Sequence, residues 1–160
     1  MKQVLFLDDD HHRIAEIRER AEELSLDLTV VETADDCIAE LKQRMFDLVM
    51  LDHDLGGETY CDSSRQDCGM EVVRWLKSNG GSHGAFMIHT MNEVAAATMY
   101  MELKELGYRV RQGGFGGEKF NRYLDELLGV STSRSSGKRK KSKSVGDRIT
   151  AYFRSLRLGK

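Results

Sequence analysis

The chain of 160 residues contains no proline and only three cysteines, and each shortage excludes classes of protein. Cys37, Cys61 and Cys68 form an odd, sparse set. The last two lie further apart than the roughly two to four residues that separate cysteines in common zinc sites, so we expect free thiols in a reducing compartment. No apolar run approaches the roughly 18 residues that span a bilayer, and no signal-peptide pattern opens the sequence, so we expect a cytoplasmic protein without a membrane span.

Charge is divided unevenly along the chain. Residues 131–160 hold ten basic side chains and one acidic one, a net charge of +9. Residues 1–130 hold 14 basic and 25 acidic side chains, a net charge of −11. The overall composition, 40% hydrophobic and 31% charged, is typical of a globular protein. We therefore expect one acidic domain over residues 1–129, followed by a basic tail.

The tail divides into two parts. Residues 130–144 contain the run STSRSSGKRKKSKS, which has no apolar residue and predicts a flexible basic linker. Over residues 145–160 apolar side chains recur at helical spacing between arginines, which predicts a short basic amphipathic helix or a disordered tail. Its candidate partners are nucleic acid, an anionic membrane surface or the acidic domain itself, with a plain solvated tail as the alternative. Nucleic acid is favoured because the candidate site described next is suited to phosphates.

Short apolar runs alternate with amphipathic segments throughout the first 129 residues. Strands are predicted over 3–7, 28–31, 48–51, 85–88 and 108–110. Helices are predicted over 11–24, 69–78, 92–106 and 118–128, with another that Thr33 opens through a capping pattern with Asp36. This alternation predicts an α/β, doubly wound, five-stranded parallel sheet with the strand order 2-1-3-4-5.

Acidic and polar residues follow three of the predicted strands. Asp8 and Asp9 end the first strand, Asp52 ends the third, and His89 and Thr90 end the fourth. Ligands of such sheets gather at the carboxyl ends of the strands, so we expect these residues to meet. Crowded carboxylates repel one another unless they share a cation or a proton, and hard oxygens suit Mg²⁺ or Mn²⁺. Any one of these acids alone would be read as an ordinary loop or cap residue, but together they predict a divalent-metal site.

This arrangement resembles the CheY-like (flavodoxin-like) receiver domain of response regulators over residues 1 to about 129. In order and spacing, Asp8 and Asp9 resemble the acidic metal pair of a receiver, Asp52 the phosphoacceptor, and Thr90 the hydroxyl residue after the fourth strand. The resemblance implies phosphorylation of an aspartate with Mg²⁺ and a change that a partner or an output domain reads.

The sequence departs from the receiver pattern at three places. Receivers usually carry a Lys-Pro pair after the fifth strand, whereas VRQGGFGG places Gly113 and Gly114 there, with Arg111 as a possible substitute. The loop after the third strand usually holds a proline and is here the polar insert GGETYCDSSRQDCG. Imidazoles, His53 and His89, stand where a receiver needs none.

The two imidazoles allow two interpretations. A lone histidine near a strand end is most often structural, whereas two beside a carboxylate cluster suggest general acid–base catalysis on a phosphoester. Strand alternation bears on the choice, because Asp52 and Asp54 would face alike while His53 points away. That rule weakens once the strand has ended.

The phrases LFLDDD, DLVMLDHDLGGE, GMEVVRWL and HTMN together resemble a receiver-derived family, the cyclic-phosphate processing receiver-like domain. This resemblance covers residues 2 to 115 and implies action on cyclic-phosphate ends of RNA or on nucleotides. It implies metal ligands at Asp8, Asp9, Asp52 and Asp54. It also implies a catalytic centre of Asp52 with His53 and His89 as acid and base. Thr90, Asn92 and Arg111 are candidate substrate-binding residues, with helix capping as the alternative for Asn92.

Three functions are therefore open. The first is a metal-dependent phosphoesterase for cyclic phosphates, the second a phosphoryl-receiver switch, and the third a receiver-like module that only binds a partner. The missing lysine argues against the second, and we expect no stable phosphorylation of Asp52 by acetyl phosphate. The retained acids argue against the third, because a scaffold has no need of mutually repelling carboxylates.

Overall fold

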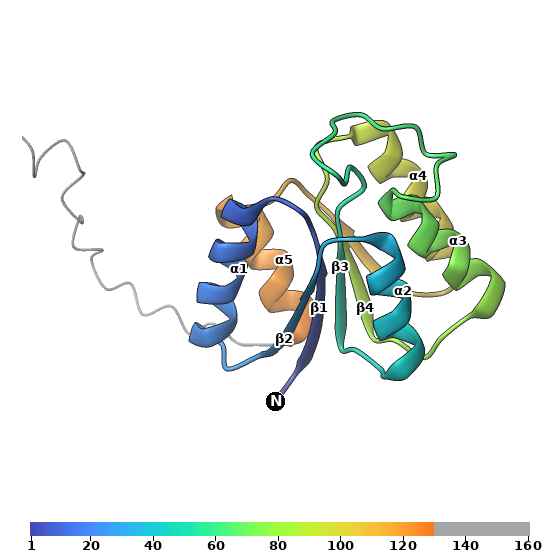
Figure 1. Ribbon diagram of the computed structural model, residues 1–160. Coiled ribbons are helices and arrows are strands. Elements are labelled where there is room, and N and C mark those ends of the chain that lie inside the picture. The colour runs from blue at the N-terminus through green and yellow to red at the C-terminus, as the bar shows by residue number, and fades with distance from the viewer. Residues whose placement is uncertain (130–160) are drawn as a thin grey trace, which may run out of the picture.

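Five parallel strands form one sheet in the order β2-β1-β3-β4-β5, as predicted (Figure 1). The computed structural model describes residues 1–129, so the predicted linker and the predicted basic helix lie outside the described residues. The strands are β1 (Gln3–Leu7), β2 (Asp27–Val31), β3 (Leu48–Leu51), β4 (Ala85–Ile88) and β5 (Arg109–Gln112). The helices are α1 (His11–Glu23), α2 (Ala34–Gln43), α3 (Gly69–Asn79), α4 (Glu93–Glu105) and α5 (Gly117–Leu128).

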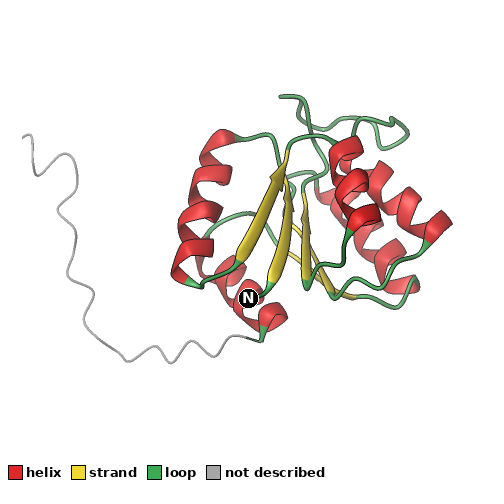
Figure 2. Ribbon diagram, turned by 60° about the horizontal axis from the view of Figure 1, so that its bottom comes forward, coloured by secondary structure: helices red, strands yellow, loops and turns green. Residues whose placement is uncertain are grey.

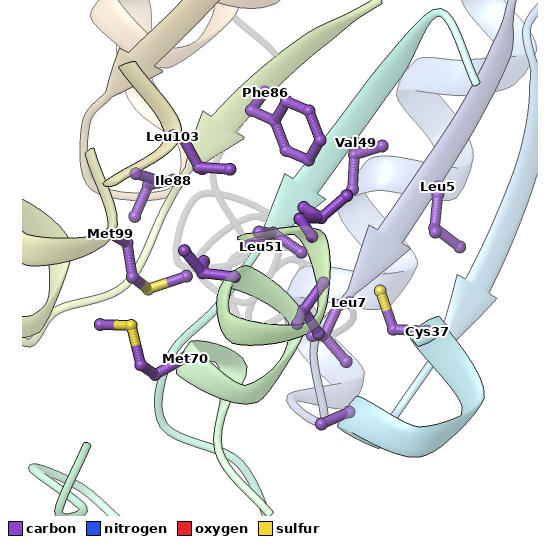
Figure 3. Close-up of a cluster of buried hydrophobic side chains, with 14 of the residues drawn as sticks. Leu5, Leu7, Cys37, Val49, Leu51, Met70, Phe86, Ile88, Met99 and Leu103 are labelled. Carbon is purple, nitrogen blue, oxygen red and sulfur yellow. The ribbon is translucent and has the colours of Figure 1, made fainter. Parts of the chain in front are cut away.

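The helices cover the sheet on both faces, α1 and α5 on one and α2, α3 and α4 on the other (Figures 1 and 2). Alternation along the strands sorts the core into two halves. Val4, Phe6, Leu48 and Met50 pack toward α1 and α5. Their neighbours in sequence pack toward α2, α3 and α4; this second half includes Leu5, Leu7, Val49, Leu51, Phe86 and Ile88 (Figure 3).

The register brings three strand ends into one row. Leu7, the last residue of β1, pairs with Leu51, and Leu51 pairs with Ile88. The residues that follow these three strands therefore start from neighbouring positions at the carboxyl edge of the sheet. This is the row in which the sequence predicted the site.

Polar side chains cap the N-termini of three helices. Asp10 caps α1 by accepting from the backbone N–H groups of His12 and Arg13. Thr33 accepts from the N–H of Asp36 at the start of α2, and Asn92 caps α4 by accepting from the N–H of Ala95. Within residues 1–129, no helix has both the length and the apolar character needed to cross a membrane.

The predicted fifth strand was placed too early in the chain. It was expected over residues 108–110, whereas β5 runs from Arg109 to Gln112. β5 is an edge strand, and Val110 is its one buried residue. Its flanking Arg111 and Gln112 carry no apolar signal, so hydrophobic patterning could not place its end.

Candidate functional site

Asp8 and Asp52 lie side by side beyond the ends of β1 and β3. The alternation of the strands continues for one residue, so both carboxylates turn toward the α1 and α5 side of the sheet. Asp8 is fully buried, and Asp52 is only 2% exposed. Two buried carboxylates at neighbouring positions repel each other, and the structure must supply positive charge between them.

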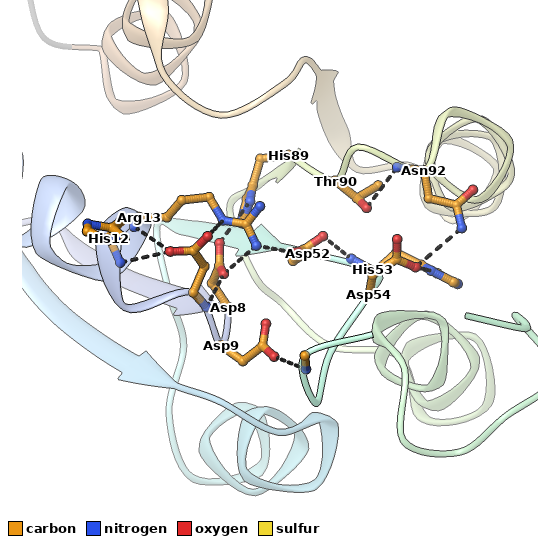
Figure 4. Close-up of polar contacts among 12 residues, drawn as sticks. Asp8, Asp9, His12, Arg13, Asp52, His53, Asp54, His89, Thr90 and Asn92 are labelled. Carbon is orange, nitrogen blue, oxygen red and sulfur yellow. Dashed lines mark hydrogen bonds and ion pairs between the residues drawn. The ribbon is translucent and has the colours of Figure 1, made fainter. Parts of the chain in front are cut away.

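Arg13 supplies that charge. Its Nη2 donates to Asp8 Oδ1 at 2.7 Å and to Asp52 Oδ2 at 2.6 Å (Figure 4). The side chain reaches the strand ends because Asp10 caps α1 and places Arg13 in the first turn of that helix. Its side chain is 21% exposed. One guanidinium nitrogen therefore serves two acids, and we call Asp8, Arg13 and Asp52 the Asp8–Asp52 site.

One cation does not fully satisfy this site. Burial raises the pKa of Asp8 to about 6, although hydrogen bonds from Arg13 and from the N–H of Asp10 oppose that rise. Burial also raises the pKa of Asp52, against the opposing effects of the Thr90 hydroxyl and Arg13. Within residues 1–129 the second Asp8 oxygen, Oδ2, is buried without a hydrogen-bond partner. Further positive charge at this place would be stabilising.

The buried ring of His89 lies beside the Asp8 carboxylate. Its ring stacks on Phe6 at a centroid distance of 4.8 Å and meets Phe115 edge-on at 5.8 Å. Nδ1 is 3.5 Å from Asp8 Oδ2, and the ring is fully buried. Burial, together with the charge of Arg13, lowers the pKa of His89 to about 3, so the imidazole is neutral near pH 7.

An open hollow of about 450 Å³ lies above the Asp8–Asp52 site. Asp9, Asp52 and Thr90 line it together with His12 and Arg13 from the start of α1. Asp9 Oδ2 also accepts from the backbone N–H of Gly57 at 2.6 Å, and this hydrogen bond links the end of β1 to the loop after β3. Carboxylates, a hydroxyl and basic side chains thus share one hollow.

His53 points away from this hollow, as strand alternation indicated. Its Nδ1 lies 2.7 Å from Asp54 Oδ1 and its Nε2 lies 2.9 Å from Ser63 Oγ, and the ring is fully buried. Burial lowers the pKa of His53, but Cys68 and Asp54 outweigh burial and the net pKa is raised. The acid–base roles of His53 and His89 stay predictions, because the structure places neither ring on the wall of the hollow.

Asp54 lines the hollow but is already heavily hydrogen bonded. Besides His53, the N–H groups of Tyr60 and Cys61 and the amide of Asn92 donate to its carboxylate, at 2.8, 3.2 and 3.3 Å. Burial raises its pKa, but these partners, His53 first, outweigh burial and the net pKa is lowered. Asp54 is therefore a stably ionised residue that holds the loop after β3.

The three predicted substrate-binding residues lie in different places. Thr90 lines the hollow, and its Oγ1 accepts from the N–H of Asn92 at 3.2 Å. Asn92 is divided between capping α4 and donating to Asp54. Arg111 forms an ion pair with Glu126 of α5 and is not among the residues that line the hollow.

Sequence reasoning missed the basic residues at the hollow, which are His11, His12 and Arg13, and one more, Lys119, at a second hollow. Arg13 and His12 follow the acids directly in the sequence, and the Asp10 capping position was the signal that could have placed them over the strand ends. Lys119 lines a second hollow of about 530 Å³ together with Thr90 and Gly113. It comes from the first turn of α5, so no strand-end motif marks it.

Comparison with known proteins gave one family match. The family described as the cyclic-phosphate processing receiver domain matches residues 3–105. The comparison with curated proteins found no match.

Solved receiver domains share the fold. The non-phosphorylated receiver domain of HemR from Leptospira biflexa is 19% identical, with a TM-score of 0.61 over 82% of this chain and 97% of that one. The response regulator TrrA from Thermotoga maritima, solved with Mg²⁺ and BeF, is 14% identical, with a TM-score of 0.59 over 82% and 100%. The receiver domain of a sensor histidine kinase from Pseudomonas aeruginosa, with magnesium in its active-site cleft, is 14% identical, with a TM-score of 0.57 over 81% and 99%.

Proposed function

The chain belongs to the family of cyclic-phosphate processing receiver domains, and we propose that it binds a divalent cation at the Asp8–Asp52 site and hydrolyses a cyclic phosphate ester in the adjoining hollow. One observation carries the proposal. Two buried carboxylates from adjacent strands share a single guanidinium nitrogen, and one of their oxygens has no partner within the described residues. Added positive charge stabilises such a pair of carboxylates.

The donor set fits a hard cation. Asp8, Asp9 and Asp52 offer carboxylate oxygens, the ligands that Mg²⁺ and Mn²⁺ prefer. When bound, a divalent cation neutralises phosphate charge and polarises the phosphorus–oxygen bond. The proposal leaves Asp54 out of this ligand set, because both of its oxygens already accept hydrogen bonds.

Residues of the hollow would bind the phosphate and move protons. Arg13 is partly exposed, so on release from the acids its guanidinium can pair with phosphate oxygens. The hydroxyl of Thr90 can donate to another oxygen of the same group. Hydrolysis needs a base to take the proton of water as the new bond to phosphorus forms, and the leaving alkoxide must gain a proton. His11 and His12 are both exposed imidazoles of the hollow, and we assign these two proton transfers to His12.

His53 and His89 receive positioning roles in this proposal. The ring of His89 lies beside the Asp8 carboxylate and positions it. The ring of His53 contacts the Asp54 carboxylate, and this contact holds in place the loop that contains Gly57. The comparison of His12→Gln with His89→Phe separates the two kinds of role. We expect His12→Gln to lower kcat about 100-fold or more with metal affinity unchanged, and His89→Phe to change metal affinity first.

The test uses the full chain with Mg²⁺, Mn²⁺ or EDTA and an RNA oligonucleotide that ends in a 2′,3′-cyclic phosphate. We expect metal-dependent opening of the ring to a phosphomonoester, and a loss of about 100-fold or more in Asp52→Asn. Asp27→Asn, which changes a carboxylate at the start of β2, is the matched control. Metal binding without turnover of any cyclic phosphate would contradict hydrolysis and leave the cation site standing.

A second candidate function rests on Lys119. In a phosphoryl-receiver switch Asp52 would be phosphorylated, and the cation missing from the end of β5 would come from Lys119, which shares a hollow with Thr90. Intact mass after incubation with acetyl phosphate and Mg²⁺ tests this. A stable gain of one phosphoryl group, lost in Asp52→Asn and weakened in Lys119→Gln, would favour the switch over the hydrolase.

A further inference from the structure

A second group of metal-ligating side chains lies on the other face of the sheet edge. His53 follows β3 directly, Asp54 comes next, and Cys61 returns from the loop that precedes α3. His53 Nδ1, Asp54 Oδ1 and Cys61 Sγ form a triangle with sides of 2.7, 3.3 and 3.7 Å. We call these three residues the His53 cluster.

We propose that the His53 cluster binds a zinc ion. Nitrogen, carboxylate oxygen and thiolate sulfur together are typical ligands of Zn²⁺, whereas Mg²⁺ and Mn²⁺ prefer oxygen alone. In a tetrahedral zinc site with bonds of about 2.0–2.3 Å, the ligand atoms lie roughly 3.3–3.8 Å apart. Two sides of the triangle already match that range, and the third widens to it once an ion separates His53 from Asp54. The cysteine spacing argued against a site with several cysteines, but it does not bear on a site with one.

Crowding at one oxygen supports the presence of an ion. Four donors approach Asp54 Oδ1: the ring of His53, the N–H and the thiol of Cys61, and the amide of Asn92. A carboxylate oxygen has two lone pairs, so four donors exceed what it accepts well. An ion within the triangle would replace the contacts from the ring and the thiol, and would leave two conventional hydrogen bonds.

The surroundings match the outer shell of a metal site. The other ring nitrogen of His53, Nε2, lies 2.9 Å from Ser63 Oγ. Once an ion replaces the Nδ1 proton that Asp54 now accepts, Nε2 carries the ring proton and can donate it to that hydroxyl. The second oxygen of Asp54 accepts from the N–H of Tyr60 at 2.8 Å, which orients the carboxylate. Asp54 also lines the open hollow, so an ion has an entry path and solvent can supply a fourth ligand.

The experiment is a cobalt titration of the reduced full chain with Mg²⁺ in excess, so that the Asp8–Asp52 site is already supplied with a hard cation. We expect a thiolate-to-cobalt charge-transfer band that saturates at one equivalent and that zinc removes by competition. Cys61→Ala should abolish the band and weaken zinc binding about 100-fold or more. Cys37→Ala, which removes a buried thiol of α2, should keep both, and so should Asp52→Asn.

A second measurement, on the wild-type chain, tests the proposal even if Cys61→Ala fails to fold. In the wild-type chain, zinc should protect Cys61 from alkylation, as read by mass spectrometry of the peptide that contains it. Four results would each overturn the proposal. Three concern the cobalt band: its absence in the wild type, its persistence in Cys61→Ala, or its loss in Asp52→Asn. The fourth is alkylation of Cys61 at a rate that zinc does not change. A Cys61–Cys68 disulfide that persists in the presence of a reductant would overturn it as well.

Discussion

Asp52 and His53 are neighbours in the sequence, yet they belong to two regions with opposite chemistry. On the α1 and α5 side, the Asp8–Asp52 site joins oxygen ligands and one guanidinium beneath an open hollow. On the α2, α3 and α4 side, the His53 cluster joins nitrogen, oxygen and sulfur in a buried position. Strand alternation, continued for two residues past Leu51, assigns these adjacent residues to different faces.

The two regions also differ in how fully their carboxylates are satisfied. Asp8 has a buried oxygen without a partner, and burial raises its pKa to about 6. Asp54 is only slightly more exposed, but partners on both oxygens outweigh burial and lower its pKa. Burial raises the pKa in both places, and the hydrogen bonds to each carboxylate decide whether that rise is overcome. The first region therefore has a buried carboxylate oxygen without a partner, whereas in the second both carboxylate oxygens of Asp54 accept hydrogen bonds.

The backbone that holds both regions depends on Gly69. A Cβ built there would lie 1.9 Å from the carbonyl oxygen of Asp52, and the Gly69 N–H donates to the carbonyl of His53 at 2.9 Å. We expect Gly69→Ala to lower the free energy of unfolding by about 3 kcal/mol, because the start of α3 must move away from β3. Chemical denaturation measures this loss. Gly114→Ala, whose Cβ would meet nothing within 4 Å, should be nearly neutral, and equal effects of the two changes would contradict this account.

Opposite pH dependences should separate Asp8 from His89 in metal-free protein. The pKa of Asp8 is about 6 when folded and about 3.9 when unfolded. Between these values the folded chain binds more protons, so this residue makes the free energy of unfolding fall as pH rises from 4 to 6. The pKa of His89 is about 3 when folded and about 6.5 when unfolded, so His89 makes the free energy of unfolding rise over the same interval.

The two contributions offset each other in the wild type, and single variants expose them. Relative to the wild type, Asp8→Asn should gain about 2 kcal/mol on going from pH 4 to pH 6.5, and His89→Phe should lose about as much. Denaturation in EDTA at a series of pH values measures both. Parallel curves for the three proteins would contradict the proposed ionisation of this region.

Arg111 should have the smallest effect. It was a candidate for substrate binding, but its guanidinium pairs with Glu126 on the surface. We expect Arg111→Gln to change stability by less than about 0.5 kcal/mol, because exposed ion pairs contribute little. Turnover and metal affinity should stay within about twofold of the wild type. A loss of turnover in Arg111→Gln would show that this side chain leaves Glu126 to reach the substrate.

The sequence predicted the sheet well, because the strands that carry the site are buried and uniformly apolar. β3 and β4 have the predicted bounds, and the prediction that Asp8 and Asp52 meet followed from parallel topology. β5 was misplaced because it is a polar edge strand. Strand alternation, which predicted the direction of the Asp52 side chain, also predicted the direction of the His53 side chain.

What the sequence could not predict depends on side-chain reach and on the path of a loop. Arg13 was overlooked because its link to Asp8 and Asp52 depends on the start of α1 at the strand ends, which the Asp10 cap signals but helical periodicity does not. Cys61 reaches His53 only through the fold of a loop without regular structure. The interpretation of His53 as a catalytic partner of Asp52 came from their adjacency in the sequence, whereas the structure places the ring of His53 against Asp54, Cys61 and Ser63.

The central claim is that Arg13 occupies a place that a divalent cation takes over. Calorimetric titration of the full chain with Mg²⁺ and Mn²⁺ tests it most directly, with Arg13→Gln and Asp52→Asn beside the wild type. Removal of the guanidinium removes a competitor, so we expect Arg13→Gln to bind the ions more tightly, on the order of tenfold or about 1.4 kcal/mol. Asp52→Asn should lose most of the affinity. Weaker binding in Arg13→Gln, or binding in Asp52→Asn equal to that of the wild type, would contradict the account.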